Sequence, residues 1–219
     1  MAKRPVYIVS MRDALVDELY IDFDWYSGFA ITQKQKSIKS LHENFVKDNK
    51  DKKVLEISSK SPTSLGVSLS AFNLMINKKN SEEKFSVECA FQSSKVFENG
   101  GPYKELLSKS SLEAKKYDKL TTSGDLINFQ YNNVDWELEP KTLFYDWLYI
   151  TALSLDINKD LATQLLEYNA FTDIEFNPKK SVNCQAYSAA LYVSLYRRGL
   201  LQKALTSIDE YKKVVLTTK

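Results

Sequence analysis

Histidine and cysteine are scarce in this chain of 219 residues, and their scarcity argues against several kinds of site. Two cysteines, Cys89 and Cys184, are too few for a disulfide framework, and they fit a reducing compartment. The one histidine, His42, has no Cys/His cluster around it that would indicate structural zinc. We therefore expect neither a metal site nor a resident cofactor.

Long apolar runs and targeting segments are missing as well. No run approaches the ~20 apolar residues of a membrane-spanning helix. The first ten residues, MAKRPVYIVS, lack the apolar core of a secretory signal peptide. The sequence therefore predicts a soluble, cytoplasmic protein that has no membrane partner.

The excess of positive charge is small, because 30 Lys and Arg residues face 28 Asp and Glu residues, for a net charge of +2. No global basic field indicates a nucleic-acid binder. The exception is residues 34–53, which hold seven lysines. This segment is either a solvated helix face with a following loop, or a phosphate contact through Lys34, Lys36 and Lys39.

Several catalytic motifs are also absent. The chain has no GxGxxG, P-loop or GxSxG pattern, which removes support for dinucleotide, NTP and α/β-hydrolase chemistry. A Ser/His/Asp triad would need His42, which the lysine-rich helix around it marks as a surface residue rather than a base. Cys89 has no base beside it, and we expect it to be buried.

What the chain has is an ordinary apolar content of 43% and many aromatic residues, 13 Tyr, 11 Phe and 3 Trp. This composition predicts one globular domain with a good core, in which aromatic faces are available for a base or ribose to stack on. Hydrophobic periodicity and turn residues then assign the elements. Strands are expected at 5–9 and 54–57, an alternating stretch at 66–72, a polar turn at 76–84, a polar loop at 171–184, and helices at 31–46, 86–97, 106–116, 143–155, 161–168, 186–196 and 201–214.

The stretch from Ser86 to Lys95, SVECAFQSSK, is the most informative. On a helix, Glu88, Gln92 and Lys95 would form one polar stripe, which the turn at Gly100, Gly101 and Pro102 follows. The stripe is either the solvated face of a surface helix or a site. The ~10 Å between Glu88 and Lys95 could hold a ribose. Glu88 could stabilise an oxocarbenium-like centre or activate water, and Lys95 could act as a nucleophile or an electrostatic clamp.

The pattern V-E-x-x-F-Q-x-x-K at residues 87–95 resembles the central motif of NADAR domains. Shorter segments resemble other parts of that family: LGVSLSAFN at 65–73, SSLEAKK at 110–116, the tryptophan at 136 with the helix after it, the aspartate at 173 and the asparagine at 183. The N-terminal WYSGFAITQKQKSIKSLHENF resembles the NADAR proteins that are paired with DarT-type DNA ADP-ribosyltransferase toxins.

This resemblance implies an α+β, mainly helical fold: a single NADAR-like domain at residues 54–219 with a small β element, and an N-terminal extension, residues 1–53, packed on it. It also implies an antitoxin hydrolase, an ADP-ribosyl glycohydrolase that removes ADP-ribose from guanine bases in DNA modified by the cognate toxin. Glu88 and Lys95 would then be catalytic. The other expected substrate contacts are Gly66, Ser70, Phe72, Asn73, Phe91, Gln92, Trp136, Asp173 and Asn183.

Two other functions remain open at this point. One is a small-molecule N-glycosidase of the same fold that acts on phosphoribosyl-type metabolites. The other is a non-catalytic antitoxin that binds its toxin directly. Release of free ADP-ribose from modified DNA separates the first hypothesis from both.

Overall fold

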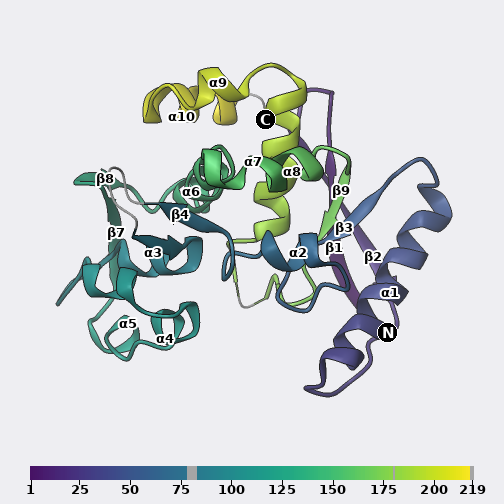
Figure 1. Cartoon of the computed structure of the whole chain (residues 1–219), viewed down its shortest axis with the longest axis horizontal. Coiled ribbons are helices and arrows are strands. Elements are labelled where there is room, and N and C mark those ends of the chain that lie inside the picture. The colour runs from purple at the N-terminus through teal and green to yellow at the C-terminus, as the bar shows by residue number, and fades with distance from the viewer. Residues whose placement is uncertain (78–82, 180, 218–219) are drawn as a thin grey trace. The chain divides into compact units, whose positions relative to one another are not determined.

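The computed structural model describes residues 1–77, 83–179 and 181–217 (Figure 1). The chain forms two compact units. Unit 1 consists of Met1–Ser70 and Asp160–Lys219, and unit 2 consists of Ala71–Lys159. Both contain helices and short strands, which confirms the α+β prediction. The expected boundary between residues 53 and 54 lies inside unit 1, immediately before a strand.

Unit 1 contains a four-stranded sheet in the order β2-β1-β9-β3. Its strands are β1 (Ala2–Val9), β2 (Val16–Phe23), β3 (Val54–Glu56) and β9 (Ala170–Thr172). β1 runs antiparallel to β2 and β9, whereas β3 runs parallel to β9. The sequence predicted β1 and β3 but placed 171–184 in a polar loop. That was wrong for β9, because Phe171 and the residues beside it are fully buried.

Two helices pack against the β1 region of this sheet. Val6 belongs to a cluster with apolar side chains of α1 (Ile31–Asp48). Its neighbour Tyr7 makes an edge-to-face contact, 5.5 Å between ring centroids, with Tyr187 of α8 (Gln185–Arg197). Successive strand residues point to opposite faces, so α1 and α8 cover opposite sides of the sheet. Both helices were predicted.

The other helices of unit 1 are short. α2 (Ser64–Ser68) covers the start of the alternating stretch expected at 66–72, and its N-terminus is capped by the Thr63 hydroxyl, which accepts from Gly66 N at 3.1 Å. α7 (Lys159–Leu165) was predicted, but the single helix expected at 201–214 is in fact α9 (Leu201–Ala204) and α10 (Ile208–Thr217). Within the described residues, none of the helices combines the length and the apolarity needed to cross a membrane.

Unit 2 is built around α3 (Val87–Ser93). The strands form a hairpin, β4-β5, and a three-stranded sheet, β6-β7-β8. The elements are β4 (Met75–Asn77), β5 (Lys84–Ser86), β6 (Lys95–Phe97), β7 (Leu126–Tyr131), β8 (Val134–Trp136), η1 (Lys104–Ser108), α4 (Ser111–Lys115), α5 (Lys119–Thr122), α6 (Leu143–Leu153) and η2 (Asp156–Asn158). The turn expected at 76–84 falls largely on residues 78–82, which lie outside the described part of the chain.

Helix α3 differs from the prediction in two ways. All seven of its residues are buried, so it is not a surface helix. It also ends before Lys95, which begins strand β6. The hydroxyls of Ser93 and Ser94 both donate to the Ala90 carbonyl, and such bonds compete with helix propagation. Gln130 N of β7 then donates to Ser94 O at 2.7 Å, which starts the sheet. Glu88 and Lys95 therefore do not share a helical stripe.

Candidate active site

The start of α3 fixes the position of Glu88. Ser86 caps the helix by accepting from Cys89 N at 3.1 Å, and Ser111 Oγ donates to the Ser86 hydroxyl at 2.7 Å. The backbone N–H of Glu88 donates to Ala71 O at 2.9 Å. Glu88 itself is 7% exposed. A carboxylate is therefore held by a capped helix in an almost closed environment.

Glu88 has a side-chain partner one turn further along α3. Gln92 Nε2 donates to Glu88 Oε1 at 3.0 Å. The other end of the same amide, Gln92 Oε1, is buried and has no hydrogen-bond partner. A buried acceptor without a donor costs ~1–3 kcal/mol, and its position beside the Glu88 carboxylate distinguishes Gln92 Oε1 from other such atoms among the described residues, such as Trp136 Nε1. Glu88 and Gln92 thus present a carboxylate and an unmatched acceptor side by side.

Lys95 reaches the same region from β6, where it pairs in register with Phe129. Its Nζ lies 5.1 Å from the centroid of the Phe91 ring, within range of a cation–π contact. Burial lowers the pKa of Lys95, the charge of Glu88 opposes that shift, and the charge of Lys115 adds to it. The amine therefore interacts electrostatically with Glu88, although the two residues lie on different elements.

The turn at Gly100, Gly101 and Pro102 holds the backbone of Lys95. A Cβ built on Gly101 would lie 2.2 Å from Lys95 O, and the φ of Gly101 is +87°. Phe97 N also donates to Gly100 O at 2.7 Å. The sequence suggested that this turn follows directly on the helix, but α3 ends at Ser93 and β6 lies between the two. The turn packs on β6, and it requires glycine at 101 for both space and backbone conformation.

Aromatic side chains surround this group. The Phe91 ring lies 5.3 Å from Phe129 and 5.1 Å from Tyr145, measured between centroids. Trp136, expected to stack on a base or ribose, is 2% exposed and packs 4.9 Å from Trp147. Trp136 therefore lies in the core of unit 2, where its indole N–H is buried without a partner.

Phe72 and Asn73 precede the β4-β5 hairpin. Asn73 is exposed, and Phe72 is half-buried with Lys115 Nζ 5.1 Å from its ring centroid. The α4 segment that carries Lys115 begins with a capping box: Ser110 Oγ accepts from Glu113 N, and Glu113 Oε2 accepts from Ser110 N. Unit 2 therefore brings together Phe72, Glu88, Phe91, Gln92 and Lys95 with the additional cation Lys115.

The remaining predicted substrate contacts lie in unit 1. A Cβ on Gly66 would lie 2.0 Å from Glu56 O, so this glycine permits a close approach of α2 to the end of β3. Ser70 is buried, and its hydroxyl donates to Val67 O at 2.7 Å. Asn183 is half-buried, and its carbonyl accepts from Ser181 Oγ at 3.3 Å. Their assignment to substrate binding stays a prediction.

Asp173 follows β9 and organises its own loop. Its Oδ1 accepts from the backbone N–H groups of Glu175 and Phe176, and its Oδ2 accepts from Gln185 Nε2 at 3.0 Å. Burial raises its pKa, and the charge of Glu56 adds to that shift. A role for Asp173 in substrate binding likewise stays a prediction. Both side-chain oxygens of Asp173 already accept hydrogen bonds, from the backbone of its own loop and from Gln185.

His42 is partly buried rather than a surface residue. Its Nε2 lies 2.8 Å from Thr172 Oγ1, and burial lowers its pKa to about 4. The imidazole is therefore neutral near pH 7. Among the residues that the structure describes, no group of three His, Cys, Asp or Glu side chains is arranged to hold a metal ion.

Comparison with protein families places these observations in context. Residues 2–219 match the family model described as DarT1-associated NADAR antitoxin. The chain belongs to this family. A search of curated proteins found no match. The family description supports an antitoxin role and associates the NADAR antitoxins of this group with DarT1.

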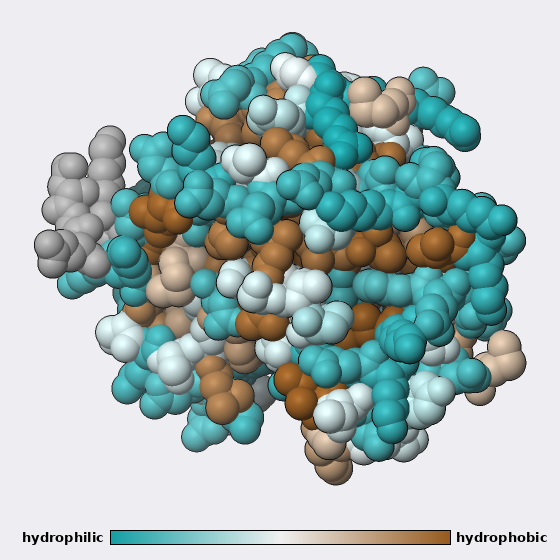
Figure 2. Space-filling model, turned by 45° about the vertical axis from the view of Figure 1, so that its right-hand side comes forward, coloured by the Kyte–Doolittle hydropathy of each residue, from teal (hydrophilic) through white to brown (hydrophobic). Residues whose placement is uncertain are grey.

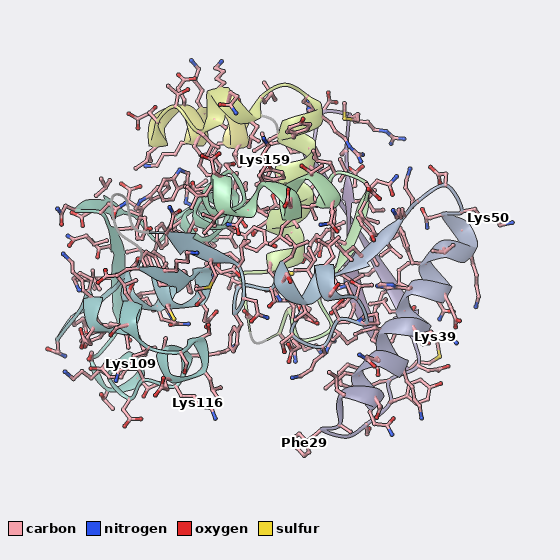
Figure 3. All side chains as sticks on the ribbon, viewed as in Figure 1. Phe29, Lys39, Lys50, Lys109, Lys116 and Lys159 are labelled. Atoms are coloured by element: carbon pink, nitrogen blue, oxygen red, sulfur yellow. The ribbon has the colours of Figure 1, made fainter. Side chains whose placement is uncertain are left out.

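In this NADAR antitoxin, the three lysines expected to contact DNA differ in their surroundings. Lys34 Nζ lies 4.3 Å from the Trp25 ring centroid, and Lys36 Nζ lies 6.0 Å from that of Tyr26. Lys39, labelled in Figure 3, forms an exposed ion pair with Glu43 at 3.7 Å. Exposed pairs of this kind contribute little to stability, so Lys39 remains available to a phosphate.

Sequence reasoning did not single out Lys115. Lys115 lies in the segment SSLEAKK, which resembles the family, but nothing in that segment distinguishes Lys115 from Lys116. In this NADAR antitoxin the charge of Lys115 contributes to the lowered pKa of Lys95. The charge of the adjacent Lys116, labelled in Figure 3, is not among the causes of that lowering.

Proposed function

We propose that this chain is an ADP-ribosyl glycohydrolase that removes ADP-ribose from guanine bases in DNA. The observation that supports this most is the buried Glu88–Gln92 pair with its unmatched acceptor and the neighbouring Lys95 of lowered pKa. Together they provide an anion, a hydrogen-bond acceptor and an amine within one aromatic environment.

Glu88 serves the bond-breaking step. When the N-glycosidic bond breaks, its electron pair goes to the guanine nitrogen, which takes up a proton from solvent, and positive charge develops at the anomeric carbon. A nearby carboxylate stabilises that charge. Water then adds to the anomeric carbon and gives its proton to Glu88. The bond from Gln92 Nε2 orients the carboxylate, and Gln92 Oε1 accepts from a hydroxyl of the ribose.

Lys95 has two possible roles, and the structure changes their balance. A charged ammonium would clamp the sugar and its neighbouring phosphate. A neutral amine would add to the anomeric carbon of the ring-opened sugar and pass a proton to the guanine nitrogen, which leaves. Water would then hydrolyse the imine that remains on Lys95, giving the free aldehyde and the amine. Lys95 directly follows Ser94, the C-cap of α3, so the C-terminus of this helix favours the charged form, whereas burial opposes it. Its lowered pKa increases the neutral fraction and favours the amine.

Lys34, Lys36 and Lys39 supply the contact with DNA in this proposal. They lie on α1 and carry positive charge toward a polyanionic backbone. Phe72 and Asn73 in unit 2, together with Gly66, Ser70, Asp173 and Asn183 in unit 1, remain proposed substrate contacts. No cofactor takes part, and the DarT1 toxin is the genetic partner that supplies the modified DNA.

The test is to incubate the protein with DNA that a DarT-type toxin has ADP-ribosylated on guanine. The proposal expects free ADP-ribose and unmodified DNA as products, measured by chromatography. A small-molecule N-glycosidase would instead hydrolyse phosphoribosyl compounds and leave this DNA unchanged. A non-catalytic antitoxin would bind the toxin and release nothing.

A further inference from the structure

The loop at residues 24–30, between β2 and α1, presents aromatic rings at the surface. Phe29 is fully exposed and Tyr26 is 41% exposed. Figure 3 shows the Phe29 ring at the outer end of the loop, directed away from α1. Apolar side chains reach the surface elsewhere too, among hydrophilic ones, on the face shown in Figure 2. Single exposed apolar residues are normal in proteins, so Phe29 is informative only through its surroundings.

The base of this loop is anchored to α1. Asp24 N donates to Ser40 Oγ at 3.0 Å, and Tyr26 N donates to Ser37 Oγ at 2.9 Å. Trp25 packs edge-on against the buried Phe23, with 6.3 Å between centroids. These contacts fix Trp25 and the backbone of Asp24 and Tyr26 before any ligand arrives, which reduces the entropy lost on binding.

Cations surround the rings. Arg4 Cζ lies 5.6 Å from the Trp25 ring centroid, and Lys34 Nζ lies 4.3 Å from it. Lys36 Nζ lies 6.0 Å from the Tyr26 ring. The first turn of α1 contains no acidic residue, and the acidic residue of the loop itself is Asp24. Positive charge therefore dominates around this aromatic group.

We propose that this surface, the aromatic tip, binds single-stranded DNA. It consists of Trp25, Tyr26 and Phe29 with Arg4, Lys34 and Lys36. The Phe29 ring stacks on an unpaired base, and the cations contact the flanking phosphates. This inference rests on the proposed function, because it takes DNA as the substrate, and it adds a surface that holds the strand through a stacked base.

Two physical arguments select this partner. Every base has a flat face, so stacking on an exposed aromatic ring tolerates any sequence, but in a duplex those faces are already stacked on neighbours. An apolar protein surface could also cover Phe29, yet it would offer no negative charge to Lys34 and Lys36, which lie beside the rings. Aromatic rings interleaved with cations fit a polyanion that has accessible bases.

The test measures binding of a fluorescent, unmodified single strand of about 12 nucleotides by anisotropy, a length within the site sizes of single-strand binders. Phe29→Ala should weaken binding roughly 5- to 100-fold, because stacking of one base has about that value. Phe29→Trp should retain it. Met11→Ala is the matched control. Met11 is exposed in the turn between β1 and β2, and the loop at residues 24–30 follows the other end of β2.

Three results would overturn the proposal for the aromatic tip: unchanged affinity of Phe29→Ala, tighter binding to a duplex of the same sequence, or full retention of binding by Phe29→Leu, which would show that the ring does not stack on a base. ADP-ribose release from a single modified nucleotide, which offers no second base, is measured in parallel. If that release proceeds while Phe29→Ala binds DNA normally, only the tip fails. If the wild type binds the strand through Phe29 but releases no ADP-ribose, only the proposed function fails.

Discussion

Gln92 donates its side-chain amide to Glu88 over 3.0 Å, while its own buried carbonyl oxygen accepts from nothing. Only one end of the Gln92 amide is therefore hydrogen-bonded. A fully structural glutamine at this position would use both ends of its amide, as buried amides usually do. A ribose hydroxyl would complete the bonding without moving Glu88. The arrangement therefore supports a ligand site in unit 2 without an appeal to any other part of the chain.

Replacing Gln92 with Met tests this relationship. The variant keeps the apolar stem but removes the acceptor, so we expect ADP-ribose to bind about tenfold more weakly in titration calorimetry, as for loss of one good hydrogen bond. Stability to thermal unfolding should change little, because a buried unsatisfied atom disappears along with the bond to Glu88. Unchanged affinity would mean that Gln92 Oε1 does not contact the ligand.

A second prediction concerns an imine at Lys95. Incubation with ADP-ribose and borohydride should give a stable adduct, because reduction of the imine fixes the sugar to the amine. Mass spectrometry of peptides should locate the adduct on Lys95, and Lys116→Ala should form it as readily as the wild type.

The Lys95 variants identify the other outcomes. If no adduct forms and Lys95→Arg retains most activity, the ammonium is a charged clamp. If Lys95→Arg and Lys95→Ala both turn over modified DNA normally, Lys95 lies outside the site.

Lys115 gives a third prediction, for pH dependence. Its positive charge lowers the pKa of Lys95, so Lys115→Met should raise that pKa. If the neutral amine is the reactive form, the rate rises with pH up to this pKa, and the rising limb of the variant moves to higher pH. At pH values on and below the rising limb the variant is then less active than the wild type, and at higher pH the two are equally active. Lys116→Met is the control, and an identical profile for both variants would remove Lys115 from the site.

A fourth prediction concerns the lysines of α1. Changing Lys34, Lys36 and Lys39 together to Gln should flatten the salt dependence of DNA binding. The expected loss in log–log slope is about 0.7 per single-strand contact, or about 0.9 per duplex contact. Affinity for free ADP-ribose should not change. The same change at Lys47, Lys50 and Lys52, at and beyond the end of α1, is the matched control, and an equal effect there would indicate nonspecific electrostatics.

The sequence predicted the elements whose signals are local. The apolar spacing in residues 31–46 identified α1, because this pattern depends on neighbours within one or two turns. The same holds for α6 and α8. The single helix expected at 106–116 is in fact η1 and α4. The α+β class followed from the family resemblance.

What could not be predicted depends on distant partners. Lys95 lies in a strand rather than a helix because β6 pairs with β7, where Lys95 is opposite Phe129. These two residues are over thirty positions apart, and no helical pattern reveals such a pairing. β9 looks polar because Asp173 follows it, yet Phe171 is buried between β1 and β3. Of the candidate site, Glu88 and Gln92 have the i, i+4 contact expected from their spacing, whereas Lys115 emerged only from the folded arrangement.

The most direct test of the central claim, that Glu88 catalyses release of ADP-ribose, is the single-turnover rate of Glu88→Gln on DNA ADP-ribosylated at guanine. The substitution keeps the shape and removes the anion, and losing one electrostatic stabiliser typically costs about 10²–10³ in rate. We predict a loss of that size, while Glu137→Gln, a change at an exposed carboxylate in unit 2, retains the wild-type rate. A Glu88→Gln rate equal to the wild type would contradict the account.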